Sequence, residues 1–497
     1  MKEEGNYLTI SVKLLSIILI VLCVQNCVSK SGNKDEKHSK VYEQGSIDKP
    51  ERLVIAMVEE LMKLRDIPPG MSVAVGLKNE IIFSEGYGYS NLETKKPVTP
   101  KTQFRAASVS KIITATALAK LVEDEKLNFN DLVNKYIPTY PQTKDSVTIK
   151  QLSGHLSGIP HYSGNDKIEN RHYATVEDAL GVFSHTQLLH KPGDKYKYST
   201  HSYTLLSRVM EKASNKDFLS LLEDDLFNSL GMVSTGPDMR KNPGVEMTEL
   251  YSFNEKGMNK GLPIKINNPE DPSYKWAGGG LISTPTDLVR MANSYMNGFI
   301  KKDIIDMMFE TQKLNSGEET GVGIGWRQNW DMDNRKVYEH AGGMGGARSI
   351  ICLFPNQKLT ISIMGNAKRP RRIEETAHML ALPFLTLPSP SVQPRGVTKL
   401  NITINSNGEK IKKHGTLILD GKNDHLIIEN EITYKLIYMQ RENKYALIHP
   451  HGILYTEISL DNGVISGKTM YYKSPNITKP SEGLPLFEFS SDLKIEN

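Results

Sequence analysis

Apolar and polar positions divide the chain into a long region of mixed helices and strands and a shorter region of alternating strands. Apolar residues recur at helical spacing over 51–65, which predicts a helix, and the strand-like runs 71–77 and 81–84 follow with a short polar turn, which predicts a hairpin. Strand-like runs return later, at 321–326, 336–340, 349–354 and 359–364, and a helix is expected over 372–385. Because strands stand at both ends with helices between them, we expect an α+β domain, residues 51–385, whose terminal strands share one sheet.

The end of the chain follows a different pattern. Residues 386–397 contain a proline-rich run, Leu387 to Pro394, which predicts a stiff linker. Beyond it, short runs of alternating apolar and polar residues are separated by Asn-Gly and Asp-Gly pairs, which are typical of hairpin turns. We therefore expect residues 398–497 to form a small all-β domain, to which the sequence assigns no chemistry.

The N-terminal residues predict a targeting segment. An apolar run, Leu14 to Val24, is short for a membrane span and is followed by Cys27 and a polar tract rich in Ser, Lys, Asp and Glu. This order resembles a bacterial lipoprotein signal: residues 1–27 would be the signal peptide, Cys27 the lipidated residue, and 28–50 a disordered tether to the membrane of the cell envelope. Asn26 stands where a small residue is usual, so the plain signal peptide of a secreted protein, or an uncleaved anchor, is the alternative. A mitochondrial transit peptide is disfavoured because the segment carries acidic residues and no arginine.

Composition narrows the classes of function. With 497 residues, 38% hydrophobic residues and a net charge of +4, the chain can bury a large core and shows no basic face or motif for binding nucleic acid. It holds three cysteines, Cys23, Cys27 and Cys352, the last in an apolar run. We therefore expect a fold that does not depend on disulfides, and neither a metal site nor a cofactor is implied.

Ser108 and Lys111 are the first candidates for chemistry. They lie three residues apart where an apolar helix is expected to begin, so they share one helical face and Lys111 can reach toward the Ser108 oxygen. A serine is a poor nucleophile until a base takes its proton, and a lysine can be that base only when it is neutral. Burial in an apolar helix and the positive helix N-terminus would both lower the pKa of Lys111. The spacing alone is weak evidence, since it recurs at three polar sites, and an isolated match is more simply an N-cap serine with a solvated lysine.

Two further clusters add candidates. Tyr198-Ser199-Thr200 precedes an apolar helix, and a tyrosine there would serve either as a second acid or base beside Lys111 or as a packing aromatic with a hydrogen-bonded hydroxyl. His340-Ala341-Gly342-Gly343 lies between two strand-like runs. Glycines there let a substrate backbone approach a strand, and exposed N–H groups can face a developing oxyanion. Taken alone, this cluster would be interpreted as a loop.

In order and spacing, the three clusters S-x-x-K, Y-S-T and H-A-G resemble the signature elements of the serine β-lactamase and DD-peptidase superfamily, in its class C-like branch. The runs 86–91, 151–160 and 277–288 are also similar to that family, and 273–280 is especially similar to the mitochondrial β-lactamase-like serine proteases of animals. The resemblance covers residues 51–385 and leaves out both ends of the chain. It implies a β-lactamase/transpeptidase-like fold, in which an antiparallel sheet is flanked by helices and joined to a helical subdomain.

The resemblance also implies roles for single residues. Ser108 would be the acylated nucleophile, Lys111 its general base, and Tyr198 the second acid or base that protonates the leaving group. The backbone N–H groups of Ser108 and Gly343 would form the oxyanion hole.

Three more positions are implied to bind substrate: Thr200, His340 and Gly342. His340 would line the pocket where related enzymes keep a lysine. Thr200 stands where asparagine is commoner, and its side chain lacks the carboxamide that would bind the side-chain amide of a β-lactam. This departure shifts the expected substrate from β-lactams toward peptides or esters.

We therefore expect a serine hydrolase of the cell envelope that forms an acyl-enzyme on Ser108 and acts on a small peptide or a D-amino-acid-type amide. Ester or β-lactam hydrolysis is the alternative, because one fold hosts all three activities through small changes in the pocket. A catalytically silent binding or scaffold protein is the rival from another class. The intact set of Ser108, Lys111 and Tyr198 argues against that rival.

Overall fold

The computed structural model describes residues 49–138, 140, 146–162, 166, 168–239, 246–385, 393–406, 408–429, 433–471 and 485–491. The expected signal peptide with Cys27, nearly all of the expected tether, and residues 386–392 of the expected linker lie outside the described residues. In the part of the chain that is described, no helix is both long enough and apolar enough to cross a membrane.

A seven-stranded antiparallel sheet forms the centre of the α+β domain, in the order β3-β2-β1-β12-β11-β10-β9. Its strands are β1 (Gly70–Leu77), β2 (Glu80–Asn91), β3 (Lys96–Pro97), β9 (Arg327–Trp330), β10 (Lys336–Met344), β11 (Ala347–Phe354) and β12 (Leu359–Gly365). β1 pairs with β12 from Met71↔Gly365 to Leu77↔Leu359. Strands from the two ends of the domain therefore lie side by side at the centre of one sheet, as predicted.

The predicted hairpin is confirmed as β1 and β2. Its turn residues Lys78 and Asn79 have φ values of 50° and 72°. Two successive left-handed residues are what a two-residue hairpin turn requires, because this turn matches the right-handed twist of the strands.

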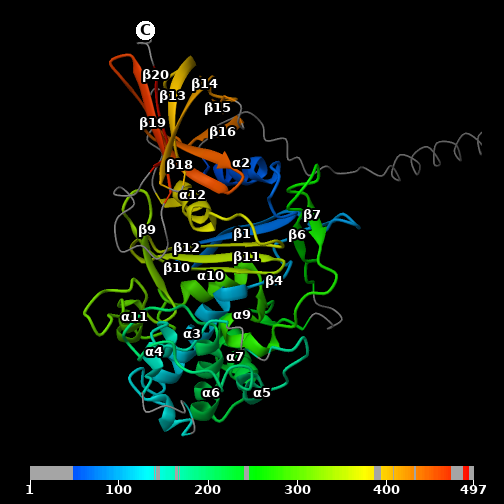
Figure 1. Cartoon of the computed structure of the whole chain (residues 1–497), viewed down its shortest axis with the longest axis vertical. Helices are drawn as coiled ribbons and strands as arrows, with labels where there is room; N and C mark the ends of the chain where they lie inside the picture. Colours follow the sequence, from blue (N-terminus) through cyan, green and yellow to red (C-terminus); the bar gives the residue numbers. More distant parts are fainter. Residues whose placement is uncertain are drawn as a thin grey trace, which may run out of the picture. The chain divides into compact units, whose positions relative to one another are not determined.

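Helices cover both faces of the sheet (Figure 1). The helices α2 (Pro50–Met62) and α12 (Ile373–Leu385) pack on one face, and both confirm expected helices, the first of which was predicted from apolar periodicity. The helix α10 (Pro285–Asn293) packs on the other face, against β1 and β12. Each face thus buries its own apolar core.

The helical subdomain lies beyond α10 and is built around α3 (Ser110–Glu123), whose residues from Ser110 to Ala119 are all buried. Around it lie α4 (Ile149–Ser153), α5 (Val176–Leu180), α6 (His201–Ser214), α7 (Phe218–Leu222), α8 (Asn228–Leu230), α9 (Trp276–Gly279) and α11 (Lys302–Phe309). Two small sheets complete the domain, one of β4 (Phe104–Arg105), β8 (Leu281–Ser283) and β5 (Gly236–Pro237), the other of β6 (Tyr251–Phe253) and β7 (Pro263–Lys265). The expected α+β fold with a helical subdomain is confirmed.

The C-terminal strands close into an eight-stranded barrel. They are β13 (Gly396–Ser406), β14 (Glu409–Leu419), β15 (His425–Ile428), β16 (Thr433–Tyr438), β17 (Lys444–His449), β18 (Gly452–Asp461), β19 (Val464–Met470) and β20 (Pro485–Ser491). Apolar side chains from these strands fill the interior, among them Leu400, Ile402, Leu417 and Phe489. The expected all-β domain is confirmed.

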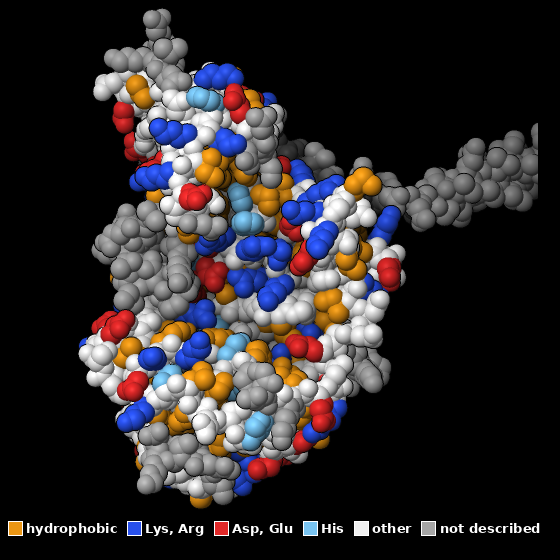
Figure 2. All heavy atoms as spheres, viewed as in Figure 1, with side chains coloured by type: hydrophobic (Ala, Val, Ile, Leu, Met, Phe, Trp, Pro, Cys, Tyr) orange, Lys and Arg blue, Asp and Glu red, His pale blue; other side chains and the backbone are white. Residues whose placement is uncertain are grey.

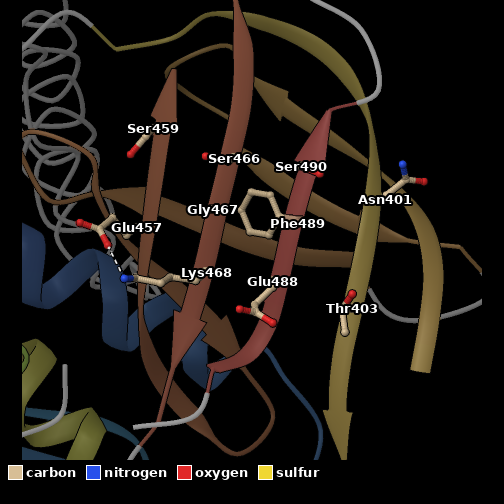
Figure 3. Close-up of a pocket in the computed structure, with 10 residues that line it drawn as sticks. All are labelled: Asn401, Thr403, Glu457, Ser459, Ser466, Gly467, Lys468, Glu488, Phe489 and Ser490. Carbon is tan, nitrogen blue, oxygen red and sulfur yellow. Dashed lines mark ion pairs between the residues drawn. The ribbon is translucent and has the colours of Figure 1, made fainter. Parts of the chain in front are cut away.

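The outer face of the barrel is polar where β18, β19, β20 and β13 lie side by side (Figure 3). Two rows of directly paired residues cross these strands, Glu457-Lys468-Glu488-Thr403 and Ser459-Ser466-Ser490-Asn401. Lys468 Nζ and Glu457 Oε2 form an ion pair of 3.3 Å within the first row. This face is the solvated counterpart of the apolar interior.

The barrel rests on α12. The backbone N–H of Arg372 donates to the carbonyl of His451 at 2.7 Å, and the N–H of Ile453 donates to Thr376 Oγ1 at 3.0 Å. The tight connection between β17 and β18 is therefore bonded to the first turn of α12, and the core on this face of the sheet continues into barrel residues.

One expected strand is absent: residues 321–326 form turns, and β9 begins only at Arg327. Gly321 and Gly325 have φ values of 70° and 78°, which an extended strand does not accommodate. The alternation of apolar residues with glycine therefore does not indicate a strand here. Conversely, β10 continues past the expected run 336–340 to Met344, through glycines for which a loop was one of the two interpretations.

Candidate active site

The segment that carries Ser108 has a strained backbone. β4 leads into a single 3-10 turn, Ala107–Val109, and then directly into α3. Ala107 has a φ of 47°, a conformation that costs a residue other than glycine about 1–3 kcal/mol and persists only where the surroundings enforce it. Here Ser349 Oγ donates to the carbonyl of Ala106 at 2.6 Å. The strand–turn–helix geometry is thus held from outside the segment.

Arg105 supplies the strongest of these anchors. Its Nε lies 2.6 Å from Asp238 Oδ2, and the two side chains are 1% and 0% exposed. Its guanidinium also donates to the carbonyls of Glu270 at 2.8 Å and Gly345 at 3.3 Å. Because breaking a buried ion pair is costly, Arg105 fixes the strand before Ser108 to two loops of the same site.

Lys111 has a fully buried side chain. Its Nζ donates to Thr200 Oγ1 at 3.1 Å and to the carbonyl of Gly278. Burial lowers the pKa of Lys111 to about 7, and the positive charge of Arg327 acts in the same direction. This confirms the predicted direction of the shift, and a substantial share of the amine is neutral near pH 7.

Tyr198 lies next to Ser108 and Lys111. The Nζ of Lys111 is 4.8 Å from the centroid of the Tyr198 ring, and the guanidinium of Arg327 is 5.4 Å from it. Burial raises the pKa of Tyr198, while the charge of Arg327 and hydrogen bonding with the side chains of Ser108 and Thr200 act against this rise. The structure therefore brings Ser108, Lys111, Tyr198 and Thr200 into one connected group.

Two histidines hold the loop that presents Tyr198. The backbone N–H of Ser199 donates to His155 Nδ1 at 3.2 Å, and that of Thr200 donates to His161 Nδ1 at 3.1 Å. Burial lowers the pKa of His161 to about 4 and that of His155 well below its ordinary value. Since only an unprotonated ring nitrogen can accept a hydrogen bond, the neutral imidazoles suit this role.

The edge of β10 forms the opposite side of the site. Its pairing with β9 ends at Glu339↔Arg327, so among the described strands no neighbour covers that edge beyond Glu339. A Cβ on Gly342 would come within 2.6 Å of the Ala106 carbonyl oxygen and 2.9 Å of Ser108 N. Glycine at position 342 therefore allows β10 to lie directly against the segment that carries Ser108.

His340 lies behind the cavity surface, as Lys111 and Tyr198 do. It is fully buried and does not line the cavity beside Ser108, and neither does Gly342. Its Nδ1 lies 2.8 Å from the carbonyl of Ala341, and its ring centroid is 6.2 Å from that of Tyr198. Burial lowers the pKa of His340 well below its ordinary value. The structure thus places a neutral imidazole near Tyr198 and not at the cavity surface.

A cavity of about 510 Å³ opens at Ser108. Its lining includes Thr200, Gly343 and Lys368. Lys275 also lines it, but its Nζ pairs with Glu270 Oε1 at 2.8 Å. Lys368 is exposed, and its side-chain amine makes no ion pair or hydrogen bond with the described residues. The cavity wall therefore carries a surplus of positive charge.

The family model for beta-lactamases matches residues 54–383. The chain belongs to the β-lactamase family. The predicted membership of the serine β-lactamase and DD-peptidase superfamily is confirmed, and the chain is a β-lactamase-like serine hydrolase by family. The human serine beta-lactamase-like protein LACTB, mitochondrial, is 27% identical over 401 residues, covering 61% of this chain and 72% of that protein. Penicillin-binding protein 4* of Bacillus subtilis is 24% identical over 366 residues, covering 71% and 81%.

Solved structures confirm the fold of this β-lactamase-family chain. SurE superimposes with a TM-score of 0.58 at 20% identity, covering 82% of this chain and 94% of SurE. A D-amino acid amidase from Ochrobactrum anthropi gives a TM-score of 0.55 at 20% identity, covering 68% of this chain and 99% of the amidase. At such low identity these likenesses show the β-lactamase/transpeptidase-like fold alone.

Sequence reasoning missed two groups of this β-lactamase-family site. The carbonyl of Gly278 accepts a hydrogen bond from Lys111, although the sequence assigned Gly278 no role in the site. Arg327 faces Tyr198 from the start of β9 and was assigned no role. A backbone carbonyl leaves no mark in a sequence, and the only signal for Arg327 was its place after the glycine-rich turn.

One set of described side chains comes close enough together to hold a metal ion: Glu339, Cys352 and His378, whose ligand atoms lie within 4.8 Å of one another. These groups already bond to each other and to Asn329. His378 Nε2 lies 2.7 Å from Glu339 Oε2, and Asn329 Nδ2 donates to Glu339 Oε1 at 2.7 Å. Burial works against the charged imidazole, yet Glu339 holds the pKa of His378 above its ordinary value. The set thus forms a buried ion pair that ties β10 to α12.

Proposed function

We propose that this chain hydrolyses amides of small peptides or D-amino acids through an acyl-enzyme on Ser108. The observation that carries the proposal is the buried amine of Lys111, with a pKa of about 7 and only neutral hydrogen-bond partners, Thr200 and the Gly278 carbonyl. Lys120, near the end of the same helix, instead forms an ion pair with Glu123. A lysine kept partly neutral in contact with a serine–tyrosine pair is suited to remove a proton.

In the proposed reaction, Ser108 Oγ attacks the carbonyl carbon of the substrate and loses its proton to the basic pair of Lys111 and Tyr198. A tetrahedral intermediate forms and collapses, the C–N bond breaks, and the departing amine takes the proton through Tyr198. A water molecule then loses a proton to Lys111 and Tyr198 and attacks the acyl carbon. The bond from that carbon to Ser108 Oγ breaks, and the proton returns to Ser108. The charge of Arg327 favours the phenolate of Tyr198 in both halves of the cycle.

The oxyanion of that intermediate would be held by the backbone N–H groups of Ser108 and Gly343. The geometry supports this assignment because Gly343 and Ser108 line the same cavity and the neighbouring Gly342 approaches Ser108 N closely. Two preorganised donors at an oxyanion stabilise the transition state by several kcal/mol, about 3–4 for a single donor in a measured case. The uncovered edge of β10 would pair with the substrate backbone.

The cavity supports a substrate that carries an acidic group. The amine of Lys368 has no acidic partner among the described residues, whereas Lys275 is neutralised by Glu270. Thr200 offers a hydroxyl and no carboxamide, which supports a peptide-like amide over a β-lactam. A relative, penicillin-binding protein 4*, is named for binding penicillin, so β-lactams belong in the substrate panel as the alternative, together with esters.

Labelling with a fluorophosphonate probe, read by intact mass, tests the proposal. The wild-type chain should gain one adduct and the Ser108→Ala variant none. Ser110→Ala is the matched control, because Ser110 lies two residues away, is buried, and accepts a hydrogen bond from Leu281 N at 3.3 Å. An equal lack of adduct in wild type and Ser108→Ala would favour the silent binding protein instead.

We also propose that the chain is tethered to a bacterial cell envelope through Cys27. The support is the signal-like N-terminal sequence together with the bacterial relative named as a penicillin-binding protein. Labelling with a palmitate analogue in a bacterial host should modify the wild type and not Cys27→Ser. Label that persists in that variant would exclude lipidation at Cys27.

A further inference from the structure

The interior of the barrel opens at one end into a second cavity. The strands β13, β17 and β19 end there, and β14, β16, β18 and β20 begin there. The cavity has a volume of about 290 Å³, near the lower end of the range of about 300–1,000 Å³ that is usual for small-molecule sites. It shares no lining residue with the cavity at Ser108.

Part of the wall of this second cavity is apolar and aromatic. The rings of Tyr434 and His449 stack with centroids 5.2 Å apart and planes 9° apart, and Phe487 lies 5.6 Å from Tyr434. Ile404 and Leu454 add aliphatic surface. Burial lowers the pKa of His449 to about 3, so its ring is uncharged at neutral pH and behaves as part of the aromatic wall.

Lys413 is a charged residue on the inward face of the barrel. It pairs in register with Ile402, whose side chain is 1% exposed in the barrel core, and directly opposed residues point to the same face of a sheet. Lys413 lines the cavity, and its side-chain amine makes no hydrogen bond or ion pair with the described residues. A half-buried, inward cation at the open end of a barrel, without an acidic partner among the described residues, can form a charge-assisted hydrogen bond with an anionic ligand.

A second cation, Arg372, lines the cavity from the adjacent end of α12, with its guanidinium 4.3 Å from the ring centroid of Tyr471. Its acidic neighbour is Glu375, at 3.5 Å. Burial raises the pKa of Glu375 to about 7, so this carboxyl neutralises Arg372 only in part at neutral pH. Among the described residues, the lining holds no Asp or Glu. Where the barrel meets the α+β domain, Figure 2 shows Lys and Arg, His and hydrophobic side chains gathered together.

From this combination we infer that the open end of the barrel binds a small amphipathic carboxylate. Its hydrocarbon chain would lie against the rings of Tyr434, His449 and Phe487, and its carboxylate would lie between Lys413 and Arg372. The volume of about 290 Å³ equals roughly ten water molecules at about 30 Å³ each. It therefore suits a chain of roughly eight to ten carbon atoms.

Calorimetric titration of the full chain with decanoate tests the inference, with decan-1-ol as the uncharged probe of equal length and acetate as the probe without a chain. Decanoate should bind saturably with one site, decan-1-ol at least tenfold more weakly, and acetate without measurable heat. Absence of saturable decanoate binding, or equal affinity for decanoate and decan-1-ol, would overturn the inference.

Single substitutions test the carboxylate-binding part and the apolar part of the site separately. Lys413→Gln should lower the affinity for decanoate at least tenfold and leave that for decan-1-ol unchanged, a pattern that loss of folding would not produce. Ile411→Trp, at a position 41% exposed at the cavity mouth, should weaken the binding of both probes. Lys468→Gln on the outer face of the barrel (Figure 3) is the matched control and should change neither affinity. Decanoate binding that persists unchanged in Lys413→Gln would refute the assigned position of the carboxylate.

Discussion

Replacing Lys111 with methionine should abolish acylation and stabilise the fold at neutral pH. Burial lowers the pKa of Lys111 from 10.5 to about 7. Each pKa unit corresponds to about 1.4 kcal/mol, so the buried amine destabilises the folded chain by about 4 kcal/mol at pH 7. Methionine has a similar length and needs no partner, but the carbonyl of Gly278 and the hydroxyl of Thr200 each lose a bond, at about 1 kcal/mol apiece. We therefore expect a net stabilisation of about 2 kcal/mol.

The pH dependence of the stability difference distinguishes the titration of Lys111 from other effects of the substitution. Between pH 7 and pH 10.5 the unfolded chain binds more protons at Lys111 than the folded chain, so the free energy of unfolding of the wild type rises with pH through this window. The Lys111→Met variant lacks this contribution. The stability difference between the variant and the wild type should therefore change by about 3 kcal/mol between pH 7 and pH 10, from about 2 kcal/mol in favour of the variant to about 1 kcal/mol in favour of the wild type.

Urea unfolding followed by circular dichroism, at both pH values, measures the difference. Lys120→Met is the control, because Lys120 lies on the same helix but is partly exposed and paired with Glu123. Its difference from the wild type should not follow the steep course expected for Lys111→Met. A difference between Lys111→Met and wild type that is the same at pH 7 and pH 10 would refute the argument that Lys111 is held neutral by burial.

Three further outcomes are expected. The value of kcat/KM should rise with pH with an apparent pKa of about 7, that of Lys111. In Arg327→Gln this apparent pKa should increase by about one unit, because removing a positive charge raises the pKa of the amine. An unchanged apparent pKa would contradict the role of Arg327. Gly342→Ala should lower kcat/KM about 10²-fold, because the new Cβ would lie 2.9 Å from Ser108 N. Unchanged kinetics would show that β10 can move away from Ser108 without loss of activity. Lys368→Met should lower kcat/KM about fivefold for substrates with a free carboxylate and not for their amides, measured as the ratio of the two.

The sequence predicted the framework of the α+β domain because local signals and tertiary structure agree there. The hairpin of β1 and β2 follows from strand-like apolar runs around a short polar turn that contains Asn79, a residue type that tolerates positive φ, and α2 follows from apolar spacing. The failed strand at 321–326 shows the limit of such patterns. Apolar residues alternate there with glycine, and alternation does not reveal that two of the glycines adopt positive φ.

The candidate site was only partly accessible to sequence reasoning. Ser108, Lys111 and Tyr198 were found because side chains of particular chemistry recur at particular spacings. The Gly278 carbonyl and the cation of Arg327 were not, because their contribution depends on folding that brings distant backbone and side chains beside Lys111 and Tyr198. The position of the His340 side chain depends on how β10 twists and how deeply it is buried. A short sequence motif determines neither property. Closure of the C-terminal strands into a barrel likewise depends on pairing β13 with β20.

The pairing of β1 with β12 bears on how the chain is made. The central ladder joins residues about 290 positions apart, Met71 and Gly365, and at about 5–20 residues per second a ribosome needs roughly 15–60 seconds to synthesise the interval. During that time β1 and β2 form at most a hairpin whose inner edge has no partner. A nascent chain that stops before β12 would keep this edge open to other strands, so truncated products should aggregate and recruit holdase chaperones, whereas chains released after Gly365 should not.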